Sequence, residues 1–161
     1  QTVHLSTSTK ISDLGDLGEK IVFRHLRGNI FSNRWDPTGD GHDQDNILTE
    51  VKTQFRHIKN NCFAIKYLPE SNNFKKCMKL DTRLIFLELP LKDEFSIWEV
   101  PPQYRKKYFK YWNPKEKCQM AGWKIPDLTL LKTYLHPGLC KKLRSLSPAD
   151  INLIRKLKGL H

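Results

Sequence analysis

A run of acidic residues directly before an alternating segment is the feature that most constrains this fold. Residues 40–46 read DGHDQDN, so three aspartates fall among seven residues. Residues 47–55 then alternate as a β-strand does, which puts Glu50, Lys52 and Gln54 on one face. Because Asp and Asn favour turns, the two segments together predict a β-hairpin whose second strand carries a glutamate and a lysine side by side.

The length of the hairpin turn decides which aspartate joins Glu50. A two-residue turn at 45–46 places Asp43 on the face of Glu50, one diagonal step away. A three-residue turn shifts the parity, so that Asp40 lies opposite Glu50 and Asp43 turns away. Because hairpins favour two-residue loops, we predict Asp43 as the partner of Glu50, with Asp40 as the alternative.

The combination of two carboxylates and a lysine points to metal chemistry. Converging carboxylates repel each other, and a hard divalent cation such as Mg²⁺ or Mn²⁺ relieves that repulsion. In metal-assisted phosphodiester hydrolysis the cation lowers the pKa of a water, while a lysine can stabilise charge on the phosphate. We therefore expect Asp43 and Glu50 to bind the metal and Lys52 to assist the water or the transition state. The alternative is an exposed hairpin with a surface salt bridge, but this strand is flanked by apolar residues, and burying an unpartnered Glu50 would be costly.

The charge balance and the cysteines narrow the class of protein further. The chain of 161 residues has 28 Lys+Arg against 17 Asp+Glu, a net charge of +11, which favours a polyanionic partner and most often nucleic acid. Its four cysteines are too widely spaced for a zinc knuckle and too few for a disulfide scaffold. No stretch has the apolar length of a membrane helix. We expect a reduced, cytoplasmic or otherwise intracellular protein of a prokaryotic or phage-infected cell, with no membrane partner.

The segment GHDQDNILTEVKTQ carries a resemblance to a known family. With Asp43 seven residues before Glu50 and Lys52 two residues after it, the chain resembles the PD-(D/E)xK nuclease superfamily, although no proline directly precedes Asp43. A preceding helix carries Glu19, which resembles the acidic residue that often supplies a further metal ligand in this superfamily. The resemblance covers about residues 12–100. It implies a Mg²⁺-dependent phosphodiesterase that acts on DNA and leaves 5′-phosphate and 3′-hydroxyl ends.

The order of predicted elements fits an α/β fold with a mixed central sheet flanked by helices, a restriction-endonuclease-like core. A helix is expected from the N-cap Ser12 to Gly28. The other predicted elements are helices over 72–80 and 147–158 and strands over 29–35, 62–68, 83–89 and 95–100. Residues 118–146 have no assignable pattern. We expect a single nuclease domain, 1–161, with an N-terminal arm over 1–10, a catalytic core over 12–100 and a basic, aromatic and helical extension over 101–161.

Several further residues are candidates for contact with the substrate. Gln54, on the face of Glu50 and Lys52, is a candidate to orient water or phosphate. Basic residues after the hairpin, and in the aromatic-rich segment after Pro101, are candidate nucleic-acid contacts: Arg56, His57, Lys59, Lys66, Arg105, Lys106, Lys107 and Lys110.

The sequence thus predicts a Mg²⁺- or Mn²⁺-dependent endonuclease acting on double-stranded DNA, of a restriction, homing, mobile-element or phage type. One such site cuts one strand, so double-strand cleavage predicts a homodimer or a higher homo-oligomer. The alternatives are a non-catalytic nucleic-acid-binding module and an RNA nuclease with the same metal chemistry.

Overall fold

Two β-sheets and three α-helices make up the part of the chain that the structure describes. The computed structural model describes residues 7–33, 36–89, 96–126 and 139–158. The strands are β1 (Asn29–Ile30), β2 (Gly41–His42), β3 (Leu48–Gln54), β4 (Cys62–Lys66), β5 (Arg83–Glu88), β6 (Ser96–Val100), β7 (Phe109–Asn113), β8 (Cys118–Lys124) and β9 (Lys141–Ser145). The helices are α1 (Thr7–Leu26), α2 (Asn72–Met78) and α4 (Pro148–Lys158), with a 3₁₀ turn, η1 (Pro102–Tyr104).

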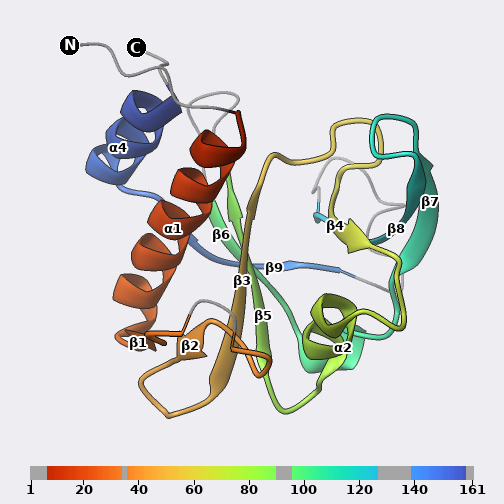
Figure 1. Ribbon diagram of the computed structural model, residues 1–161, viewed down its shortest axis with the longest axis horizontal. Helices are drawn as coiled ribbons and strands as arrows, with labels where there is room; N and C mark the ends of the chain where they lie inside the picture. The colour runs from red at the N-terminus through yellow and green to blue at the C-terminus, as the bar shows by residue number, and fades with distance from the viewer. Residues whose placement is uncertain (1–6, 34–35, 90–95, 127–138, 159–161) are drawn as a thin grey trace.

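The larger sheet is mixed, as predicted for an α/β fold. Its strand order is β1-β2-β3-β5-β6-β9, in which only β3 and β5 run parallel. The smaller sheet is antiparallel, with the order β4-β8-β7. Because β4 and α2 lie between β3 and β5 in the chain, the crossover that makes the parallel pair also delivers α2 beside the large sheet (Figure 1).

The two faces of the large sheet bury different partners. Ile85 and Leu87 of β5 join Val51 of β3 in a core shared with α1 and α4. Leu84 and Phe86, which alternate with them, join a second core shared with α2 and the small sheet. Figure 1 shows this division, with α1 and α4 on one side of the large sheet and α2 and the small sheet on the other. The face of β3 that alternates with Val51 therefore looks toward α2 and the small sheet.

Helix α1 approaches β3 closely at a glycine. A Cβ atom at Gly18 would lie 1.9 Å from Oγ1 of Thr53, so a larger residue there would push the helix off the strand. The helix begins at Thr7, so the prediction of an arm over 1–10 is wrong for residues 7–10, while residues 1–6 lie outside the described ranges. Ser12 lies inside the helix and does not cap it, because the residues before it contain no glycine or proline to stop helical continuation.

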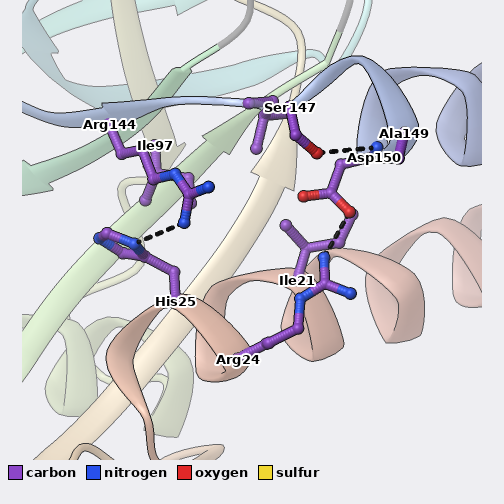
Figure 2. A pocket seen from close by; sticks show the side chains of 9 residues that line it. Ile21, Arg24, His25, Ile97, Arg144, Ser147, Ala149 and Asp150 are labelled. Carbon is purple, nitrogen blue, oxygen red and sulfur yellow. Dashed lines mark hydrogen bonds and ion pairs between the residues drawn. The ribbon is translucent and has the colours of Figure 1, made fainter.

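The last part of the chain is integral to the fold. Strand β9 completes the large sheet against β6, and α4 packs on α1 through an ion pair between Arg24 and Asp150 (Figure 2). Arg144 of β9 reaches His25 of α1, with 3.4 Å between Nη1 and Nδ1. Ser147 caps α4 as predicted, since its Oγ accepts a hydrogen bond from the N–H of Asp150 at 3.2 Å. The expected extension over 101–161 is therefore not an appendage, because it supplies strands to both sheets.

Most of the other predicted elements are found with small changes of length, and one strand is much shorter than expected. The strand expected over 29–35 is reduced to β1, and residues 34 and 35 lie outside the described ranges. The unassigned stretch 118–146 contains β8 and β9. None of the four cysteines, all of which lie in the described ranges, forms a disulfide. Within those same ranges, no helix has the length and apolar character needed to cross a membrane.

Candidate metal and catalytic site

The turn between β2 and β3 contains three residues and not two. In the observed register Gly41 lies opposite Thr49 and His42 opposite Leu48, so residues 44–46 form the turn. Asp40 directly precedes the paired residues, and its N–H donates a hydrogen bond to the carbonyl of Thr49 at 2.9 Å. Asn46 ends the turn with φ of 63°, the left-handed conformation that closes three-residue hairpin loops and that Asn tolerates. The hairpin therefore has the three-residue turn, which the sequence analysis gave as the alternative to a two-residue turn.

Asp43 organises this turn and does not share the face of Glu50. Its Oδ1 accepts hydrogen bonds from the N–H groups of Asp45 and Ile47, both at 2.9 Å. Its Oδ2 accepts a hydrogen bond from Nη1 of Arg83 at 3.2 Å. The prediction that Asp43 lies beside Glu50 is wrong, because a side chain that binds the backbone two and four residues later stabilises the longer turn.

Asp40 lies beside Glu50 instead. Its Oδ2 accepts a hydrogen bond from the N–H of Val51 at 2.7 Å, which fixes the carboxylate over β3. Burial, and then repulsion from Glu50, raises the pKa of Asp40 to about 6, against the opposing effects of the Val51 N–H and of Lys76 and Lys52. A carboxyl group with a pKa raised in this way is one whose charge the surrounding protein does not fully balance.

Glu50 is the most enclosed member of the site. The residue is only 3% exposed. Its Oε1 lies 3.1 Å from Nζ of Lys52, and its Oε2 lies 3.4 Å from Nζ of Lys76. No described residue donates a hydrogen bond to Oε2, although the atom is buried. A buried carboxylate oxygen in this situation has spare capacity to bind a cation.

Lys52 is held between Glu50 and the helix α2. Its Nζ donates a hydrogen bond to Oδ1 of Asn73 and forms the ion pair with Glu50. Burial acts to lower the pKa of Lys52, but attraction to Glu50 and its neighbours outweighs burial and raises that pKa above its ordinary value. Lys52 is therefore protonated at neutral pH, which suits a donor to a phosphate oxygen and does not suit a base that takes a proton from water.

Helix α2 supplies two residues that the sequence analysis missed. Asn73 and Lys76 are three positions apart, so they lie on one face of the helix and reach Lys52 and Glu50 respectively. Ser71 fixes the start of the helix, because its Oγ accepts a hydrogen bond from the N–H of Phe74 at 3.1 Å. The sequence predicted a helix here, but its contact with β3 depends on the crossover between β3 and β5.

The structure does not bring Glu19 into this cluster. Glu19 follows Gly18 on α1, and Gly18 contacts Thr53 on the opposite face of β3 from Glu50. Across the described ranges there is no group of three or more His, Cys, Asp or Glu residues arranged to hold a metal ion. The described site thus offers two carboxylates, those of Asp40 and Glu50.

The side chain of Gln54 connects β3 to β4. Its Nε2 donates to the carbonyl of Ala64 and its Oε1 accepts from the N–H of the same residue, both at 2.9 Å. The side-chain amide therefore joins the edge of β3 to β4 in the manner of a neighbouring strand. The prediction that Gln54 orients water or phosphate is not supported by these contacts, since both ends of the amide are engaged by protein.

The prediction that Arg105 contacts nucleic acid is wrong, because its side chain is buried. It is 0% exposed, and its guanidinium donates hydrogen bonds to backbone carbonyls at 2.8–3.3 Å. The acceptors are the carbonyls of Cys77, Lys79, Thr82 and Val100. The five N–H donors of a guanidinium lie in one fixed plane and can bind several backbone carbonyls at once. Arg105 therefore belongs to the buried core, although it lies in a basic run of the sequence.

The other predicted nucleic-acid contacts divide into two groups. Arg56 is tied to Glu88 through Nε and Oε2 at 2.7 Å and through Nη2 and Oε1 at 3.2 Å. The remaining lysines in the set are exposed: Lys59, Lys66, Lys106, Lys107 and Lys110. Arg56, His57 and Lys66 also line a groove of about 480 Å³ that includes Lys52. The candidate site therefore opens onto a surface with several basic residues.

Comparison with known proteins adds no identification. The chain matches no protein-family model and no curated protein sequence. The case for a function therefore depends on the arrangement of Asp40, Glu50 and Lys52.

Proposed function

We propose that this protein is a Mg²⁺-dependent endonuclease that hydrolyses phosphodiester bonds in DNA, with a restriction-endonuclease-like core. The observation that carries the proposal is that the carboxylate of Asp40 is held over β3 by the N–H of Val51, close enough to Glu50 for the two charges to repel, with the ammonium group of Lys52 at 3.1 Å from Glu50. The central parallel pair of β3 and β5, and the helix α1 packed behind β3, support the assignment of the core.

The two carboxylates fit a magnesium ion. Mg²⁺ is usually held by one or two carboxylates, with waters and phosphate oxygens completing its coordination, so Asp40 and Glu50 suffice as protein ligands. The buried Oε2 of Glu50 and the raised pKa of Asp40 are both consistent with a site built around an additional positive charge. When bound, the ion would neutralise charge on the phosphodiester and lower the pKa of the attacking water. Lys76 is the protein cation with which it would compete for Glu50.

Lys52 has the role of a charged donor in this proposal. Because its pKa is raised, it presents a full positive charge to the phosphate at neutral pH. Asn73 holds the ammonium group in one position through a hydrogen bond, so little reorganisation is needed when the substrate arrives. Glu50 keeps Lys52 next to the proposed metal position, so both charges act on the same phosphate.

The charge of the chain favours a nucleic-acid substrate. With a net charge of +11, the protein attracts a polyanion, and exposed lysines such as Lys106 and Lys107 are available for phosphate contacts. We assign DNA as the substrate, 5′-phosphate and 3′-hydroxyl ends as the products, and a homodimer or higher oligomer as the form that breaks both strands.

A cleavage assay tests the proposal directly. Plasmid DNA, a randomised duplex library and RNA are incubated with the protein in Mg²⁺ or in EDTA, and the product ends are sequenced. We expect Mg²⁺-dependent DNA cleavage by the wild-type protein and by Glu70→Gln, a change at an exposed glutamate, but none by Glu50→Gln. Cleavage of RNA alone would correct the substrate. DNA binding without any cleavage would leave a non-catalytic binding module.

A further inference from the structure

The groove that includes Lys52 is formed by parts of both sheets. Its walls come from the end of β3 and the residues after it, from the small sheet, and from Asn73 of α2, and the open groove between them has a volume of about 480 Å³. Because Lys52 lies in this groove, a chain that occupies the groove is adjacent to the proposed reactive phosphate. The groove is therefore the part of the surface in which the nucleotides next to the cleaved bond would lie.

Aromatic side chains line this groove. Phe55 is 40% exposed, and Tyr111 of β7, which is partly buried, lines the groove from the small sheet. The ring of His57 lies 5.0 Å from that of Tyr111, at an interplanar angle of 38°. Exposed aromatic rings in a groove are the usual platform on which unpaired bases stack, and they have no such use for bases that are already stacked within a duplex.

The positive charges in the groove can follow a phosphate backbone. Lys52 belongs to the large sheet and Lys66 to the small sheet, so both walls carry an ammonium group. Lys66 lies 3.4 Å from Glu116, but both side chains are about half exposed, 52% and 50%. A pair exposed to that degree contributes little to stability, so a phosphate group can replace Glu116 as the partner of Lys66.

The size of the groove sets the kind of substrate it accepts. The groove is open to solvent, and its volume of about 480 Å³ has room for roughly one or two nucleotides. We propose that the groove binds one or two unpaired nucleotides next to the scissile phosphate, so that the preferred substrate is a duplex with a single-stranded end or flap. This inference rests on the proposed nuclease function and adds the form of the nucleic acid.

A binding experiment in EDTA, where no cleavage occurs, tests the inference. Fluorescence anisotropy compares a blunt duplex with the same duplex bearing a single-stranded overhang at its 5′ or its 3′ end, and with an overhang of abasic sites. We expect at least one overhang to bind about five- to tenfold more tightly than the blunt end, the gain of stacking one base, and the abasic overhang to lose that gain. Equal affinity for blunt and overhanging duplexes would overturn the inference.

Matched variants locate the effect. Phe55→Ala should abolish the preference for the overhang, whereas Trp112→Ala should not, because Trp112 is 57% exposed but alternates with the groove residues of β7. Lys66→Ala should weaken overhang binding more than Lys20→Ala, a change at an exposed lysine on α1. A preference that survives Phe55→Ala in a folded protein would contradict the stacking role. The abasic arm needs no variant, so a folding defect cannot obscure the result.

The outcome for the groove is separable from the outcome for the proposed function. If plasmid DNA is cleaved with Mg²⁺ but overhangs confer no tighter binding, the groove assignment fails while the nuclease assignment holds. If overhangs bind more tightly but no nucleic acid is cleaved under any condition, the nuclease assignment fails while the binding of unpaired nucleotides in the groove holds.

Discussion

Asp40 and Asp43 lie three residues apart in the sequence, yet the surroundings of their two carboxylates differ. Asp43 receives two backbone N–H groups and the guanidinium of Arg83. Asp40 receives one N–H group and is held near Glu50, with its pKa raised to about 6. A carboxylate that accepts hydrogen bonds from protein donors stabilises the fold. A carboxylate held near a second carboxylate is a candidate to bind a cation, because a cation relieves the repulsion between the two charges. The contrast teaches which acidic residue to assign to the structure and which to the chemistry.

The largest expected effect comes from Asp40→Asn. Removing one of two metal-binding carboxylates should lower the rate of Mg²⁺-dependent DNA cleavage about a thousandfold or more, about 4 kcal/mol of transition-state stabilisation. Asp45→Asn is the matched control, because Asp45 is exposed in the same turn, and it should cleave at the wild-type rate. Wild-type cleavage by Asp40→Asn would remove the distinction between the two aspartates.

The next effect is on stability and comes from Asp43→Ala. The change leaves two turn N–H groups without their acceptor and removes one of the two carboxylate partners of Arg83, the other being Glu99, which should destabilise the protein by about 3 kcal/mol. For a chain of this length the melting temperature should fall by roughly 6–12 °C. The variant that remains folded should still cleave DNA, as measured below its melting transition. A variant of unchanged stability but without activity would reverse the roles assigned here.

A smaller effect is a pH dependence of stability without metal. Between the ordinary pKa of 3.8 and the raised value of about 6, folded Asp40 holds a proton that the unfolded chain releases, so stability falls as pH rises through this range. Asp40→Asn removes this loss, and in EDTA at pH 7 it should be more stable than the wild-type protein by about 2 kcal/mol. Melting curves in EDTA across the pH range measure the difference. Curves that coincide at every pH would show that Asp40 is not under electrostatic strain.

The smallest expected effect tests how Asn73 of α2 positions Lys52 beside Glu50. Asn73→Ala removes the acceptor that positions Lys52, and we expect cleavage to slow about tenfold, about 1.4 kcal/mol, through kcat and not through KM. Asn72→Ala changes the exposed neighbouring residue and serves as the control. An equal loss in both variants would point to a general weakening of α2 and not to the positioning of Lys52.

The sequence predicted those parts of the site that depend on local periodicity. Strand alternation alone placed Glu50 and Lys52 on one face, and the N-cap Ser147 marked the start of α4. The choice between Asp40 and Asp43 depended on a single residue of turn length. Asn46 was the available signal for the longer turn, because Asn tolerates the left-handed conformation that such a turn requires.

The remaining parts depended on tertiary contacts that no local pattern encodes. Asn73 and Lys76 reach the site only because the β3–β5 crossover sets α2 against β3. Arg105 belongs to a basic run, but the run gives no indication that four carbonyls from distant positions converge on its guanidinium. Similarly, the spacing of Glu19 placed it on a helix but did not determine which face of β3 that helix covers.

The central claim is that Asp40 and Glu50, and not Asp43, bind the metal, and direct measurement of Mn²⁺ binding tests it best. Mn²⁺ can replace Mg²⁺ at an oxygen site, and its paramagnetic resonance signal reports the bound fraction in a titration. We predict that the wild-type protein and Asp43→Asn bind Mn²⁺ with similar affinity, while Asp40→Asn and Glu50→Gln bind it at least about tenfold more weakly. Loss of Mn²⁺ binding in Asp43→Asn, with binding retained in Asp40→Asn, would contradict the account.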